Sequence, residues 1–268
     1  MTKPLNSEVP TSLVSRKAKV RMNIIMLVVL GFYLFSSFMT QSSITRFDSA
    51  FFINVWEMVV QLFPPNWGYT GVVWEKLLET IKMALIATTI AGILCIPFCL
   101  LAANNIVQNK VLYNATKMFL NIMRTIPELI LAVVFVGLFG IGVFAGILAL
   151  IIFSLGILAK LISETIEAID MNPLEAIRAS GGNTLQVIWY AVVPQVLPQF
   201  VSFTLYVFEI NVRASVVLGF VGAGGIGLIL RQQMSFLSYQ NVSTIIVITF
   251  VVVVIIDYIS NKLRGRLV

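Results

Sequence analysis

The sequence predicts an all-α polytopic membrane protein with about six transmembrane helices. Its 268 residues are 59% hydrophobic and only 11% charged, and the mean hydropathy is +0.96. A soluble domain carries about a quarter charged residues, because its surface must stay dissolved in water. The surplus of apolar side chains must therefore face lipid, and six apolar segments come close to the length that crosses a bilayer.

The first of these segments, from Asn23 to Met39, follows a basic N-terminal tail. It is too long for the core of a cleaved signal peptide and lacks a small-x-small cleavage site, so we expect a first membrane helix. The predicted spans are 23–39, 80–103, 119–139, 144–167, 187–208 and 242–259. A seventh apolar stretch, 214–230, is rich in glycine and predicts a short or re-entrant helical segment beside a pathway.

Two amphipathic stretches lie between the first two predicted spans. Residues Phe51 to Phe63 include Trp56 and Glu57 and predict a helix that lies on the membrane surface. Residues Trp74 to Lys82 carry charges at helical spacing and predict an interfacial elbow that leads into the second span.

The distribution of basic residues predicts the orientation, because cytoplasmic loops of membrane proteins are enriched in Lys and Arg. A cytoplasmic N-terminus collects most of them on one side: Lys3, Arg16, Lys17, Lys19, Arg21, Lys110, Lys117, Arg124, Arg178, Lys262, Arg264 and Arg266. The outer side keeps Arg46, Lys76, Arg213 and Arg231. Both termini are therefore predicted to be cytoplasmic, and topology accounts for the net charge of +6 without an anionic ligand.

Histidine is absent, and the two cysteines, Cys95 and Cys99, lie on one face of a predicted membrane helix. Such cysteines are usually small packing residues, so neither a disulfide framework nor a metal site is expected. A membrane-embedded enzyme would also lack the commonest general base.

The loop after the fourth predicted span, residues 168–186, contains the pattern of a short capped helix. Asn172 is a suitable N-cap, Pro173 suits the first helical position, and Glu175 falls in the first turn. Gly181 and Gly182 can end the helix with positive φ. The predicted orientation places this helix in the cytoplasm.

This loop resembles the signature loop of ABC importer permeases. The family pattern is Glu-Ala-Ala, three residues, Gly, nine residues and Ile-x-Leu-Pro; here the same spacing joins Glu175, Gly181 and Pro194. This sequence departs from the pattern at three positions, and each time one apolar residue replaces another: Ile177 for Ala, Ala191 for Ile and Val193 for Leu. The resemblance implies a methionine-importer-like fold with a cytoplasmic coupling helix that docks on an ATPase, and the implied coupling residues are Glu175, Ala176, Ile177, Arg178, Ala179 and Gly181.

Two further segments resemble phosphonate importer permeases: Arg124 to Leu129, and Phe208 to Gly227 with its Glu-x-Asn-x-Arg lead. The resemblance covers residues 72–268, so residues 1–71 are predicted to form a separate cytoplasmic tail, first span and interfacial segment. The pathway or gate candidates are Arg124, Pro127, Glu128, Glu209, Asn211, Arg213, Gly222, Gly224 and Gly225.

The resemblance also implies the partners. These are a cytoplasmic ATPase dimer that carries ATP and Mg, an extracytoplasmic phosphonate-binding protein, and a second permease copy, giving a homodimer in the lipid of the bacterial inner membrane. No nucleic acid partner is expected. The chain has no Gly-Lys dipeptide and hence no phosphate-binding loop of its own, so it is expected to be no enzyme and to hold no cofactor.

Alternatives remain open for individual residues and for the whole chain. Glu209 and Arg213 are four apart and could form only a helical salt bridge, and Glu128 could serve only the first turn of its helix. A methionine-type importer permease is one alternative, although Glu128 and the Glu-x-Asn-x-Arg run argue against it. An ion-coupled secondary transporter is another, although the chain shows no clear internal repeat.

Overall fold

The computed structural model describes residues 16–39, 49–107 and 109–266, and all of its regular elements are helices. The chain divides into two compact units, Met1–Val60 and Gln61–Val268. The predicted boundary between residues 71 and 72 stays a prediction, and the tail over 1–15 lies outside the described residues, as do Lys3 and Arg46.

The first unit contains α1 (Arg16–Met39) and all but the last residue of α2 (Ser49–Gln61). The apolar stretch Ala18–Ser37 of α1 is long enough to cross a membrane, which agrees with the predicted first span. Described side chains of α2 from Phe51 to Val60 are exposed, and its place on the membrane surface stays a prediction.

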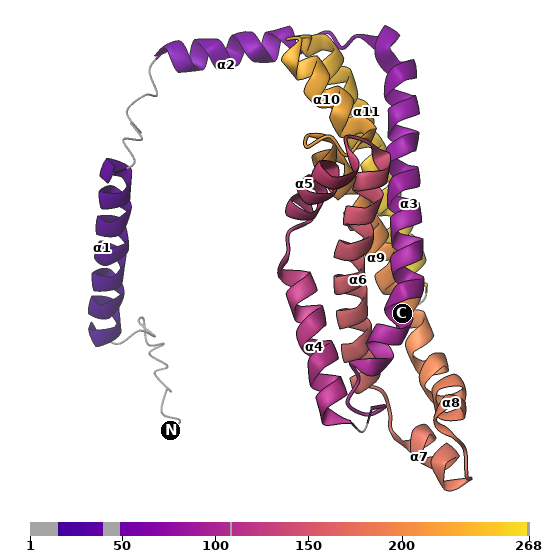
Figure 1. The fold of residues 1–268 in the computed structure, drawn as a ribbon. Helices are drawn as coiled ribbons and strands as arrows, with labels where there is room; N and C mark the ends of the chain where they lie inside the picture. Colours follow the sequence, from indigo (N-terminus) through magenta and orange to yellow (C-terminus); the bar gives the residue numbers. More distant parts are fainter. Residues whose placement is uncertain (1–15, 40–48, 108, 267–268) are drawn as a thin grey trace, which may run out of the picture. The chain divides into compact units, whose positions relative to one another are not determined.

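The second unit is a bundle built around α6 (Val143–Glu167), which contacts α3 (Thr70–Leu101), α4 (Lys110–Thr125), α5 (Glu128–Phe139) and α9 (Val193–Gly219) (Figure 1). A short 3-10 turn, η2 (Trp67–Tyr69), leads into α3. The remaining helices are α7 (Asn172–Ala179), α8 (Thr184–Val187), the π-helical turn η3 (Ile188–Val192), α10 (Gly225–Ser235) and α11 (Tyr239–Arg264).

The predicted number of spans is confirmed by the lengths and composition of these helices. Within the part of the chain that the structure describes, five helical stretches are long and apolar enough to cross a membrane, and a sixth is obtained if α4 and α5 form one span with an 84° bend between them. The stretch predicted as one helix over 119–139 is therefore broken. Ile126 and Pro127 are both extended, and Pro127 is the N-cap residue of α5. The break falls here because the residue before a proline disfavours the α conformation.

Two other boundaries differ from the sequence-based expectation. The predicted elbow at Trp74–Lys82 is an uninterrupted part of α3, where Lys76 and Glu79 pair across one turn at 2.6 Å. The span predicted to end at residue 208 continues to Gly219, since no helix breaker intervenes. The glycine-rich stretch is thus the end of α9, a turn over residues 220–224, and α10.

Candidate functional site

The helix α7 protrudes from the bundle and is anchored to it by one buried side chain (Figure 1). Leu174 is fully buried and belongs to the same apolar cluster as Ile162, Ile166 and Val187. The N-cap prediction for Asn172 is wrong: helix α7 begins at Asn172 itself, and its amide donates to the Asp170 carboxylate at 3.0 Å. The sequence alone does not distinguish Asp170 from Asn172 as the capping residue, because Asp and Asn are both good N-caps and these two lie only two residues apart.

The end of α7 follows the predicted glycine chemistry. The amide of Gly182 donates to the carbonyl of Ile177 at 2.9 Å, and the amide of Gly181 donates to that of Arg178 at 3.0 Å. These two bonds form a Schellman motif, which requires the positive φ of +81° that Gly181 adopts. A Cβ on Gly182 would lie 2.5 Å from the Ile177 side chain, so this turn is specific for glycine at both positions.

The outer face of α7 is exposed along its length. Glu175, Ala176, Arg178 and Ala179 are all exposed, while Ile177 is half-buried. A hollow of about 350 Å³ opens beside this face, between the end of α7 and the Tyr190 side chain. The predicted coupling residues therefore form one contiguous surface of small and charged side chains.

Polar contacts that the sequence analysis missed join the end of α6 to α4 and to the segment after α3, and one contact joins α7 to that same segment. The Glu167 carboxylate, at the end of α6, accepts from Lys117 at 3.1 Å, from the Tyr113 hydroxyl at 3.1 Å, and from the Asn104 amide at 3.2 Å. The Arg178 guanidinium donates to the carbonyl of Asn105 at 3.4 Å. A movement of α7 would thus act on the segment after α3 through Arg178 and on α6 through the connecting residues 168–171.

The break between α4 and α5 carries three predicted pathway residues. Arg124 and Pro127 are exposed and Glu128 is half-buried. Among the residues that the structure describes, neither Arg124 nor Glu128 forms an ion pair. The predicted topology places Arg124 with the cytoplasmic residues, but its backbone packs against Gly156, well inside α6: a Cβ on Gly156 would lie 3.3 Å from the backbone nitrogen of Arg124.

Glu209 is the centre of an ion-pair network rather than of a single pair. One carboxylate oxygen accepts from Arg213 at 2.5 Å and the other accepts from Arg264 of α11 at 2.7 Å. The predicted Glu209–Arg213 salt bridge is present, but Arg264 was not anticipated. Because both arginines contact one carboxylate, they lie at one depth, which corrects the assignment of Arg213 to the outer side and Arg264 to the inner side.

Asn211 lies fully buried where α3, α6 and α9 meet. Its Nδ2 donates to the Thr88 hydroxyl at 2.8 Å and to the Ser154 hydroxyl at 2.7 Å. These hydroxyl partners were also missed, since small polar residues in apolar helices carry no distinctive spacing. A buried amide satisfied in this way holds the helices in register, and its pathway role stays a prediction.

The glycine-rich turn packs tightly into the bundle, and Gly222, Gly224 and Gly225 are buried. All three have positive φ, between +68° and +95°. The turn places the start of α10 against α3, where the Glu79 carboxylate accepts from the Gly225 amide at 3.1 Å and the Thr80 hydroxyl accepts from the Ile226 amide at 2.8 Å. The favourable position of a carboxylate at a helix N-terminus explains why Glu79 lies here.

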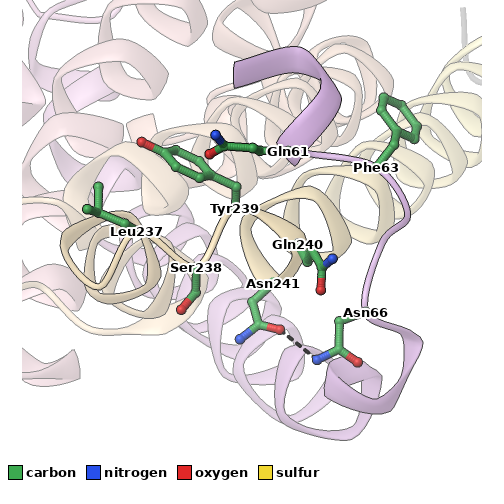
Figure 2. A pocket seen from close by; sticks show the side chains of 8 residues that line it. All are labelled: Gln61, Phe63, Asn66, Leu237, Ser238, Tyr239, Gln240 and Asn241. Atoms are coloured by element: carbon green, nitrogen blue, oxygen red, sulfur yellow. Dashed lines mark hydrogen bonds between the residues drawn. The ribbon is translucent and has the colours of Figure 1, made fainter. Parts of the chain in front are cut away.

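A polar pocket of about 430 Å³ lies where the start of α3 meets the turn between α10 and α11 (Figure 2). Asn66 donates to Asn241 at 2.9 Å across it, and the Thr244 hydroxyl donates to the carbonyl of Asn66 at 3.0 Å. None of the predicted site residues lines this pocket. Within the described residues, no group of three or more His, Cys, Asp or Glu could hold a metal ion.

Comparisons with known proteins identify relatives over about three quarters of the chain. Residues 95–267 match the family described as the binding-protein-dependent transport system inner membrane component. The phosphate-import permease protein PhnE of Mycolicibacterium smegmatis is 40% identical over 209 residues, which cover 78% of this chain and 39% of that protein. The phosphite transport system permease protein PtxC of Stutzerimonas stutzeri is 37% identical over 206 residues, covering 76% of this chain and 74% of that protein.

Solved structures resemble the bundle as well. A chain of the MetNI methionine ABC transporter in an inward-facing conformation matches with a TM-score of 0.66, covering 76% of this chain and 99% of that chain at 22% identity. An identity this low supports the fold alone, and it confirms the predicted methionine-importer-like fold.

Proposed function

The chain belongs to the family of binding-protein-dependent transport system inner membrane components, and we propose that it is the permease subunit of an ATP-driven importer for phosphonates or related phosphorus oxyanions such as phosphonate esters and phosphite. The observation that carries the substrate class is the 37% to 40% identity to permeases named for phosphite and phosphate import. The Arg124–Leu129 and Phe208–Gly227 segments support the same class.

The exposed face of α7 is the proposed docking surface for the ATPase. A helix of eight residues with one buried anchor, Leu174, can be held firmly while its other side chains remain free for a partner. Glu175 and Arg178 would fix the register of docking. The contact of Arg178 with the Asn105 carbonyl, and the chain connection to α6, would pass the displacement to the bundle. ATP and Mg would bind to that partner, so this chain would not be an enzyme.

The remaining features of the proposed assembly follow from the same family. Two copies of the chain would enclose the pathway in the bacterial inner membrane, with both termini in the cytoplasm. An extracytoplasmic binding protein would deliver the substrate. Six spans, counting the bent pair α4–α5 as one, are consistent with termini on one side.

A methionine-type permease remains the alternative within the family. Methionine import permeases match this chain at only 24% to 27% identity, against 37% to 40% for the permeases named for phosphite and phosphate import, and this difference favours the phosphorus oxyanion. The family assignment leaves no support for the ion-coupled alternative.

The test is transport by the complete complex, with its ATPase and binding protein, in sealed vesicles. We expect ATP-dependent uptake of labelled methylphosphonate or phosphite, and no ATP-dependent uptake of labelled methionine. ATP-dependent uptake of methionine without uptake of either phosphorus compound would contradict the proposed substrate class.

A further inference from the structure

Helix α4 has three distinct faces. Thr116 and Leu120 are buried against the bundle, whereas Met118 and Ile122 are 65% and 51% exposed and suit lipid. The third face is a polar stripe of α4, defined as Lys110, Asn114, Lys117, Asn121, Arg124 and Thr125. At 3.6 residues per turn these positions fall within about 100° of the helix circumference.

The outer end of this stripe lies at membrane depth. The backbone of Arg124 packs on Gly156, which lies about 20 Å along α6 from Val143 and about 16 Å from Glu167 at the rise of an α-helix. Arg124 is therefore level with the interior of a membrane-spanning helix and with neither of its ends. A charged side chain at this depth is costly in lipid and normally faces a water-filled cavity or a partner.

The polar stripe is not neutralised within the described bundle. Lys117 pairs with Glu167, but Asn114, Asn121 and Arg124 are exposed, and no described residue forms an ion pair with Arg124. A hollow of about 400 Å³ lies beside four residues of the stripe, Asn114, Lys117, Asn121 and Thr125, and it also borders Met118 and Ile122 but not Arg124. The stripe thus carries amide donors along its length and, near its end, the guanidinium of Arg124, which is unpaired within the described residues.

We propose that the polar stripe of α4 lines the substrate pathway and that Arg124 binds the phosphorus oxyanion there, an inference that rests on the proposed function. A guanidinium presents a planar fork of donors that matches two oxygens of a phosphonate. The N-terminus of α5 is close in sequence, but Glu128 occupies its first turn, so the anion is assigned to Arg124 and not to that helix end.

Cysteine labelling tests whether the stripe faces water, independently of the substrate. In the complete complex, Asn121→Cys should react with a water-soluble, charged thiol reagent in at least one state, with or without ATP. Phe119→Cys, on the opposite side of α4 and outside the hollow, is the matched control and should react at least about tenfold more slowly. The native Cys95 and Cys99 are buried and free, and the unsubstituted protein gives the background. Equal rates, or no reaction at Asn121→Cys in any state, would overturn the proposal.

Uptake tests the role of the charge. Loss of a charged hydrogen bond predicts that Arg124→Gln lowers methylphosphonate imported per ATP hydrolysed at least about tenfold, while Arg124→Lys retains part of it and Arg21→Gln retains all. An unchanged ratio of uptake to ATP hydrolysis for Arg124→Gln would overturn the proposal. A parallel fall of uptake and ATP hydrolysis would also overturn it, because that result is expected if Arg124 binds a lipid headgroup phosphate instead. Recovery of uptake by the double change Arg124→Glu with Glu128→Arg would instead assign Arg124 to an ion pair with Glu128.

Discussion

The two arginines that contact Glu209 should contribute very unequally to the stability of the bundle. The Glu209 side chain is 10% exposed, the Arg264 side chain is 23% exposed, and the Arg213 side chain is 52% exposed. A charged hydrogen bond with little exposure contributes about 1.5–3 kcal/mol, whereas a half-exposed pair falls below about 1 kcal/mol where its arginine reaches water, as at the surface of a micelle. Arg264 should therefore dominate, although its oxygen contact of 2.7 Å is longer than the 2.5 Å contact of Arg213.

A double-mutant cycle measures these two couplings separately. We expect Glu209→Gln to lower the free energy of unfolding by about 2–4 kcal/mol, because it leaves a half-buried arginine without its partner. The coupling of Glu209 with Arg264 should be about 1.5–3 kcal/mol, and that with Arg213 below about 1 kcal/mol. The assay is reversible unfolding of the purified permease in mixed micelles, with each Arg→Gln change made alone and together with Glu209→Gln.

A charge swap gives the sharpest refutation. Exchanging Glu209 and Arg213 would place an arginine beside Arg264, so the swapped protein should stay at least as unstable as Glu209→Gln. Recovery of wild-type stability by the swap, or equal couplings to both arginines, would show that the network does not work as described.

Two further changes test the packing of the bundle. Gly227→Ala places a Cβ 1.9 Å from the Val216 carbonyl oxygen and should prevent α10 from packing on α9, so the yield of folded protein should fall severely. The control Gly92→Ala should fold normally, because no atom lies within 4 Å of the added Cβ. Similar yields of Gly227→Ala and Gly92→Ala would contradict the close packing of α10 on α9. Asn211→Ala should lower the free energy of unfolding by about 1–3 kcal/mol, because it leaves the buried Ser154 hydroxyl without a partner, while the Thr88 hydroxyl keeps its bond to the Ala84 carbonyl. The exposed Asn121→Ala should change the free energy of unfolding by less than about 0.5 kcal/mol.

Local signals in the sequence predicted the parts of the structure that depend on neighbouring residues. The short helix α7 has its predicted glycine end at Gly181, and the Glu209–Arg213 pair forms because it spans one helical turn. The spans were found from apolar length alone. The bend at Pro127 could have been expected from proline chemistry, but a count of apolar residues does not detect a change of direction.

Contacts between distant segments could not be derived in the same way. Arg264 lies 55 residues from Glu209, and Glu79 lies 146 residues from Gly225, so no periodicity links either pair. Each contact also depends on the vertical offset between helices, which the lengths of the spans leave undetermined. The depth of Arg124 is a further example, because it is set by the crossing of α4 over Gly156.

The central claim is that the exposed face of α7 connects this permease to an ATPase. The most direct measurement is of labelled methylphosphonate uptake and ATP hydrolysis in vesicles that contain the complete complex. It compares the wild-type protein with Glu175→Lys and with the matched control Glu57→Lys, which makes the same charge change in α2. Glu175→Lys should assemble in the membrane at wild-type yield but lose ATP-driven uptake and the stimulation of ATP hydrolysis by the loaded binding protein, while Glu57→Lys keeps both. Normal uptake by Glu175→Lys would contradict the claim.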